Sequence, residues 1–209
     1  MSDSESLPFG AGVAATVLEI LHLPGATAIM KITEAALDKK RRETAEILIE
    51  EIKKGRHGEI NFDEHDVDPL IDIILRFSKA VSEGAAKANL RLLAQVIAGL
   101  KKNRALESDR FRRWASILED MTRDELVAVG LAYRIAKTSK PGPDSTFSHD
   151  LHEALHAKFG EETAGLLAAV SRTGLLAPVS AFGGLAYFPT PWLQQLGELA
   201  DLERPVMSV

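Results

Sequence analysis

The chain contains no cysteine. Disulfide scaffolds, thiolate metal sites and cysteine nucleophiles are therefore excluded. Aromatic residues make up only 6% of the sequence, whereas alanine and leucine are abundant, and this balance favours helices over sheets. An excess of positive charge is also lacking, because 25 basic side chains stand against 30 acidic ones and leave a formal charge of −5. The chain thus has no overall basic footprint for nucleic acid.

A continuous membrane-spanning run is missing as well. The most apolar stretch covers residues 7–30, but Glu19, His22 and the pair Pro24-Gly25 divide it. A transmembrane helix needs about 20 uninterrupted apolar residues, and no basic segment precedes this stretch as it would in a secretory signal. We expect a short buried helix over residues 11–22 and a cytoplasmic protein. Contact of the stretch with a membrane surface is the alternative, because a basic cluster follows it, formed by Lys39, Lys40, Arg41 and Arg42.

Helical periodicity is the strongest signal that is present. Residues 26–54 hold neither proline nor glycine and stop at Gly55, which predicts one long helix. Apolar residues then recur three or four positions apart over residues 70–102, with a weak point at Gly84, and again over residues 111–118. We predict a shared antiparallel helical core that contains Leu70, Phe77, Leu93, Ile97, Trp114 and Leu126.

The pattern changes in the last third of the chain. A capping box at Thr122–Glu125 predicts a helix to about residue 137, and residues 138–147 form a loop rich in proline and small polar residues. We expect Ser148 to cap the next helix, and the stretch LLAPVSAFGGLAYF to form two short strands joined around Gly183-Gly184. A further helix over residues 161–172 precedes the strands, and Thr190-Pro191 begins the last one.

Three helices, a hairpin and a final helix follow one another in the order of a winged helix. The sequence therefore predicts a mainly α protein with two parts. An antiparallel helical region covers residues 1–121, and a small winged-helix-like module with one β-hairpin covers residues 122–209. The loop 138–147 lies inside that module.

One family resemblance covers about residues 70–200. The stretches KANLRLLAQVIAGLKK (87–102) and FRRWASILEDMTRDELVAV (111–129), followed by SRTGLL and YFPTPWLQQLGELA, resemble the bacterial abortive-infection Abi-alpha family. The resemblance implies a role in phage defence. It brings no established catalytic residues to this chain.

The winged-helix-like module offers little to DNA. Such modules place their third helix in the major groove, and here that helix begins with Glu161 and Glu162 and has Arg172 as its single basic residue. From residue 123 onward, seven Lys or Arg stand against ten Asp or Glu, whereas phosphate contacts need cations. We expect packing or protein contacts. The alternative is a nucleic-acid-binding regulator that uses a basic patch of Lys39, Lys40, Arg41, Arg42, Arg110, Arg112 and Arg113.

The motif HEALH at residues 152–156 matches the H-E-x-x-H pattern of zinc metallopeptidases. Two histidines four positions apart project from one helical face onto a metal, and the glutamate between them activates a bound water. His149 lies on the same face. However, Asp150 and Lys158 flank the motif with charge, and no histidine after residue 156 supplies a further ligand. We expect a solvated helix face and no cofactor. The alternative is zinc bound by His152 and His156, with His149 as a weaker candidate.

These observations favour a non-enzymatic cytoplasmic interaction or regulatory protein with a protein partner, acting in phage defence if the resemblance holds. P-loop, dinucleotide-binding and nucleophile-elbow motifs do not occur. The enzyme alternative is a zinc-dependent hydrolase that uses His152, Glu153 and His156.

Overall fold

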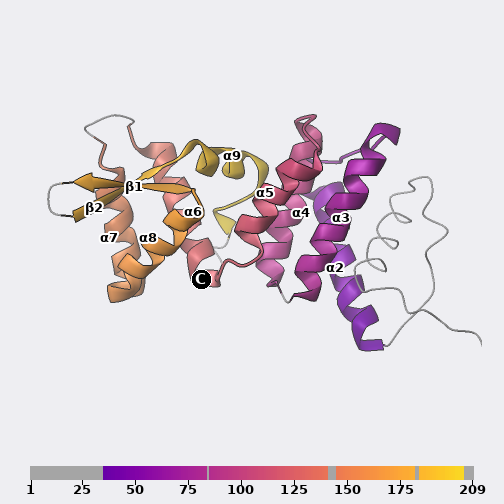
Figure 1. Ribbon diagram of the computed structural model, residues 1–209, viewed down its shortest axis with the longest axis horizontal. Coiled ribbons are helices and arrows are strands. Elements are labelled where there is room, and N and C mark those ends of the chain that lie inside the picture. Colours follow the sequence, from indigo (N-terminus) through magenta and orange to yellow (C-terminus); the bar gives the residue numbers. More distant parts are fainter. Residues whose placement is uncertain (1–34, 84, 141–144, 182–183, 205–209) are drawn as a thin grey trace, which may run out of the picture. The chain divides into compact units, whose positions relative to one another are not determined.

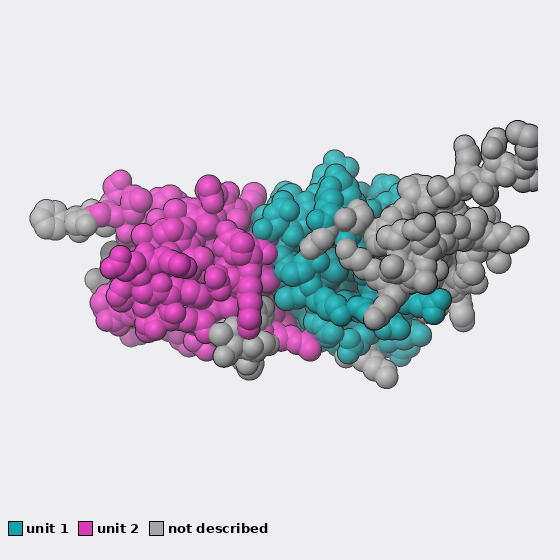
Figure 2. All heavy atoms as spheres, turned by 90° about the horizontal axis from the view of Figure 1, so that it is seen from below, with its two compact units in different colours: residues 1–120 teal, residues 121–209 magenta. Residues whose placement is uncertain are grey.

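The computed structural model describes residues 35–83, 85–140, 145–181 and 184–204. The chain divides into two compact units, the first ending at Asp120 and the second beginning at Met121 (Figure 2). The described residues are mainly helical, with one two-stranded antiparallel hairpin near the C-terminus (Figure 1), as the composition and periodicity predict. The apolar stretch 7–30 and the helix expected over residues 11–22 lie outside the described residues.

The first unit is a helical bundle built around one central helix. Helix α4 packs against each of the other three long helices of the unit. Almost every side chain from Asn89 to Leu100 is buried, because neighbours cover α4 on several sides. The elements of the unit are α2 (Ala35–Lys54), the short 3-10 helix η2 (Glu64–Asp66), α3 (Val67–Ser82), α4 (Lys87–Lys102) and α5 (Ser108–Leu118).

Helix α2 ends immediately before Gly55, as the sequence predicts, and packs on α4 through both apolar and polar contacts. The buried Glu51 carboxylate accepts hydrogen bonds at 3.0 Å from Gln95 and from Arg91, both on α4. A buried carboxylate is costly unless it is paired and hydrogen-bonded, and this one is both. The part of the predicted helix that the structure describes, Ala35–Lys54, is helical, and the rest of the prediction lies outside the described residues.

The apolar periodicity over residues 70–102 belongs to two helices, α3 and α4. The first ends at Ser82 and the second begins at Lys87. The predicted core residues are all buried, but they do not share one core. Leu126 belongs to the second unit, whereas the other five belong to the first. Helical periodicity identifies which face is buried but not which helices it is buried against.

The second unit combines four helices with the hairpin, and its first helix contacts most of the others. The capping box is confirmed: Thr122 Oγ1 accepts a hydrogen bond from the Glu125 amide at 3.2 Å, and the Glu125 carboxylate accepts one from the Thr122 amide at 2.7 Å. Helix α6 then packs on α7, α8 and α9. The elements are α6 (Arg123–Thr138), α7 (Phe147–Phe159), the 3-10 helix η3 (Gly160–Glu162), α8 (Thr163–Arg172), β1 (Leu176–Ala181), β2 (Gly184–Pro189) and α9 (Pro191–Leu199).

Ser148 has a different role from the predicted one. Helix α7 begins at Phe147, and the Ser148 hydroxyl accepts a hydrogen bond at 3.0 Å from the Tyr187 amide on β2. It therefore ties the first turn of α7 to the hairpin instead of capping its own helix. Thr190 likewise makes no side-chain cap for α9, and its hydroxyl donates to the Gly174 carbonyl at 2.7 Å. In both cases a partner distant in sequence competes with the local cap.

None of the helices in the described part of the chain is long and apolar enough to cross a bilayer.

Candidate functional site

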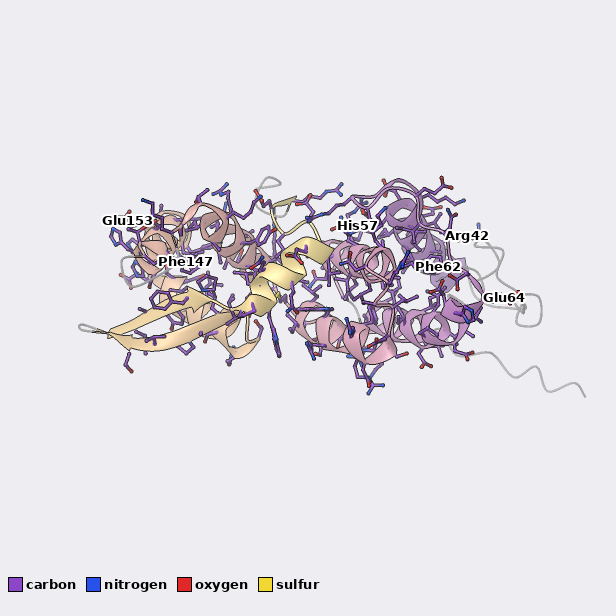
Figure 3. All side chains as sticks on the ribbon, turned by 90° about the horizontal axis from the view of Figure 1, so that it is seen from above. Arg42, His57, Phe62, Glu64, Phe147 and Glu153 are labelled. Atoms are coloured by element: carbon purple, nitrogen blue, oxygen red, sulfur yellow. The ribbon has the colours of Figure 1, made fainter. Side chains whose placement is uncertain are left out.

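The HEALH motif lies on α7, with its apolar side buried and its polar side in solvent. Leu151 and Leu155 are completely buried and attach α7 to the rest of the unit, whereas His149, His152, Glu153 and His156 are all exposed. Phe147 lies on the side of α7 that faces the hairpin, and Glu153 lies at the margin of the unit (Figure 3). A zinc hydrolase needs an enclosed metal and water, and this helix face has no such enclosure.

The structure arranges the motif as two separate pairs. The rings of His152 and His156 stack with centroids 5.9 Å apart and planes inclined by 13°. His149 instead approaches Glu153, with 3.5 Å between its Nε2 and the carboxylate Oε1. Among the described residues, no group of three or more His, Asp or Glu side chains is placed to hold one metal ion. The face can therefore offer a metal at most two imidazoles together.

The Gly160 carbonyl selects the tautomer of a neutral His156 ring. His156 Nδ1 lies 2.9 Å from this oxygen, which can only accept a hydrogen bond. A neutral His156 therefore carries its proton on Nδ1, and its Nε2 presents a lone pair. The same carbonyl also accepts a 2.7 Å hydrogen bond from Thr163 Oγ1. Gly160 itself has a φ of +56°, a conformation suited to glycine, and it ends α7 at this point.

The basic residues lie on two helices of the first unit. Lys39, Lys40 and Arg41 belong to α2, but their side chains are outside the described part, and Arg42 beside them is exposed. On α5, Arg110, Arg112 and Arg113 are exposed as well. Arg110 pairs with Glu107, the residue before α5, at 2.9 Å, and Arg112 approaches Asp109 of α5 to 3.5 Å, so neighbouring carboxylates offset part of their charge. Such exposed pairs contribute little stability.

The hairpin carries exposed apolar side chains that sequence reasoning did not single out. Val179 and Leu185 are 47% and 62% exposed. The register pairs Val179 with Ala186 and Leu185 with Ser180, so Val179 and Leu185 project from opposite faces of the ribbon. No charged residue occurs from Thr173 to Gly197, a stretch that contains both strands and most of α9. The absence of charge was readable in the sequence, but the exposure of these side chains required the fold.

A cleft of about 440 Å³ between α6 and α9 is the other feature that the sequence did not indicate. Tyr133 and Lys137 of α6 line one side, and Gln194 and Glu198 of α9 line the other. Lys137 Nζ lies 5.4 Å from the centre of the Tyr133 ring and 2.9 Å from a carboxylate oxygen of Glu203. Tyr133 and Ala136 are half-buried walls of this cleft. Periodicity alone does not distinguish a core face from a cleft wall.

Comparison with known proteins found no family model, no curated protein and no solved structure that matches this chain. The resemblance to the Abi-alpha family therefore stays a prediction.

Proposed function

We propose that the chain is a non-enzymatic cytoplasmic interaction protein whose second unit is a winged-helix-like module that binds another protein through its hairpin. The observation that carries this proposal is the exposed, uncharged surface of the hairpin, with Val179 and Leu185 in solvent and no charge from Thr173 to Gly197. Apolar side chains exposed on both faces of a short, uncharged ribbon offer surface for a protein contact. A wing that binds DNA needs cations for phosphate, and this one has none.

The third helix of the module supports the same conclusion. Glu161 and Glu162 are exposed immediately before α8, and the exposed positions within α8 include Ala164 and Ala168. A helix that enters the major groove presents donors and cations to bases and phosphates. Here Arg172 in the last turn is the single charged residue of α8. Glu161 and Glu162, immediately before α8, would repel the DNA backbone.

The edges of the hairpin restrict how a partner can bind. The Tyr187 amide donates to Ser148, away from β1, so the Pro178–Tyr187 pair is not bonded across the ladder and Pro178 faces the open edge of β1. Proline has no amide hydrogen, and a proline at an edge opposes the addition of another strand. The partner must therefore recognise side chains. Because Val179 and Leu185 lie on opposite faces, a partner that covers both must enclose the hairpin in a groove.

Two further parts of the proposal rest on the sequence. The lack of cysteine agrees with a reducing compartment, for which we propose the cytoplasm. The resemblance of residues 70–200 to the Abi-alpha family supports phage defence as the process in which the interaction takes place.

Site-specific photocrosslinking in cells tests the proposal. A photoreactive phenylalanine analogue is placed at Leu185 in one variant and at the exposed Arg134 of α6 in a control variant. We expect one protein to be crosslinked from position 185 and not from position 134, and we expect Leu185→Asp in the untagged chain to abolish any protection against phage plating. Identical products from both positions contradict the proposal. Sub-micromolar, sequence-selective binding of duplex DNA by the full chain with a steep salt dependence contradicts it as well.

A further inference from the structure

We propose that His152 and His156 form a two-nitrogen chelating site for a divalent late transition-metal ion on the exposed face of α7. The two imidazoles are four positions apart, so they lie one turn from each other on the same face. Their near-parallel rings, with centroids 5.9 Å apart, already face each other. Imidazole nitrogen suits Zn²⁺, Ni²⁺ and Cu²⁺.

The hydrogen bond to Gly160 prepares one of the two ligands. Because the Gly160 carbonyl lies 2.9 Å from His156 Nδ1, the proton of the neutral ring is held there and Nε2 keeps its lone pair. Histidines that ligate metals commonly donate their other ring N–H to a backbone carbonyl or a carboxylate, which fixes the ring orientation. His156 has this arrangement before any metal binds.

The second ligand, His152, can reach the ion by rotating its side chain. Metal–nitrogen bonds are about 2.0–2.1 Å long, so two nitrogens on one ion must lie roughly 3 Å apart, nearer than the two ring centres are now. His152 is exposed, and a modest rotation of its side chain tilts its Nε2 toward that of His156. Its ring is not packed in the core, so this rotation disturbs no buried contact.

The site differs from that of a zinc hydrolase. Glu153 is close to His149, with 3.5 Å between the carboxylate and the ring, and no third described side chain joins the two histidines. Water would therefore complete the coordination shell of an ion open to solvent. A two-imidazole site follows the general affinity order of these ions, with Cu²⁺ bound most tightly. It binds metal without the enclosed, activated water that hydrolysis needs.

Metal binding here connects to the stability of the second unit. The ion would link consecutive turns at the C-terminal end of α7, immediately before Gly160 ends the helix. The unfolded chain does not hold the two imidazoles in this register, so the ion binds the folded state preferentially and stabilises it. Each imidazole binds the ion through the lone pair of a deprotonated ring nitrogen.

Titration calorimetry on the full chain, without a histidine tag and after treatment with a chelator, tests the site with CuCl₂, NiCl₂ and ZnCl₂ at pH 7.5. We expect one equivalent of Cu²⁺ to bind more tightly than the other two ions. His152→Ala and His156→Ala should each weaken that binding at least tenfold. His149→Ala and Glu153→Gln are the matched controls on the same helix face, and each should leave the affinity within twofold.

Three results overturn the site. The first is Cu²⁺ binding that survives His152→Ala, which means that the ion is held elsewhere. The second is a loss with His149→Ala as large as with His156→Ala, because that places a third imidazole in the site. The third is peptide hydrolysis by the zinc-loaded chain that Glu153→Gln abolishes, which restores the hydrolase alternative. Because every readout except the last is a binding measurement, failure here leaves the proposed role of the hairpin unaffected.

Discussion

Gly197 on α9 shows how one residue controls the packing of two helices. A Cβ atom at this position would lie 2.0 Å from the ring of Tyr133 on α6, far inside van der Waals contact. We expect Gly197→Ala to push the ring out of place and to lower the free energy of unfolding by about 1–3 kcal/mol, the usual cost of overpacking. Urea unfolding followed by circular dichroism measures the change.

The second unit contains a matched control for this substitution. Gly165 on α8 is exposed, and a Cβ added there meets no atom within 4 Å. Gly165→Ala should therefore raise the free energy of unfolding by roughly 0.5–1 kcal/mol through helix propensity alone. If the loss at Gly197 comes from the Tyr133 ring, combining Gly197→Ala with Tyr133→Ala should cost less than the sum of the two single changes. Additive costs would contradict a clash between these two residues.

Lys101 of α4 binds two carboxylates in the segment between α2 and α3. The Asp63 side chain accepts from the His65 amide at 3.0 Å, and the Asp66 carboxylate accepts from the Asp63 amide at 2.7 Å, so the pair forms a capping box before α3. Lys101, near the end of α4, donates to Asp63 at 2.9 Å and also to Asp66. The hydrogen bond from Lys101 lowers the pKa of Asp63. Burial alone would lower the pKa of Lys101, but its hydrogen bonds to Asp66 and Asp63 outweigh that effect and leave it raised.

These shifts give Lys101→Met a pH-dependent effect. A lowered carboxyl pKa stabilises the fold above the ordinary value of 3.8, and this contribution disappears as the pH falls through the lowered pKa. A raised lysine pKa stabilises it below the ordinary value of 10.5 and loses its effect above the raised one. We expect Lys101→Met to cost roughly 1–3 kcal/mol at pH 7, and clearly less in strongly acidic solution below the lowered carboxyl pKa or in strongly alkaline solution above the raised lysine pKa. Unfolding titrations across this range measure it. The exposed neighbour provides the control, since Lys102→Met should change stability by less than about 0.5 kcal/mol.

Elements whose signals are local in sequence were predicted well. The box at Thr122–Glu125 and the apolar periodicity of α5 needed only neighbouring residues, and both are confirmed. Predictions failed where a distant group decides the outcome. Ser148 binds the Tyr187 amide instead of capping α7. The close approach of Gly197 on α9 to the Tyr133 ring on α6 was likewise not indicated by spacing. Propensity describes what a segment does alone, and these contacts join residues far apart in the chain.

In the candidate site too, local spacing predicted some features, and contacts made by the fold decided the others. The H-E-x-x-H spacing correctly places His152 and His156 on one helical face, because helix geometry alone determines it. Spacing did not indicate that Glu153 approaches His149 instead of a shared ligand position, or that His156 Nδ1 contacts the Gly160 carbonyl. The exposed hairpin could have been suspected from its lack of charge between Thr173 and Gly197. Whether its side chains are exposed depends on how the two strands pack on the rest of the unit, which the sequence does not show.

The two compact units suggest that the molecule unfolds in two steps. Each unit has its own buried side chains, and completely buried leucines occur in both, among them Leu93 on α4 and Leu196 on α9. If each core is stabilised by its own contacts, removing a buried side chain from one unit loosens that unit and leaves the other protected. Hydrogen exchange followed by mass spectrometry measures protection in each unit separately.

We expect Leu93→Ala to cost roughly 2–5 kcal/mol, as large-to-small core changes do, and to speed exchange in α3, α4 and α5 while α6–α9 keep their protection. Leu196→Ala is the reciprocal variant and should show the opposite pattern, because Leu196 belongs to the second unit. Equal acceleration in both units would mean that they unfold as one cooperative structure. A cost below about 0.5 kcal/mol for Leu93→Ala, a value typical of surface sites, would be incompatible with the complete burial of Leu93 in the first unit.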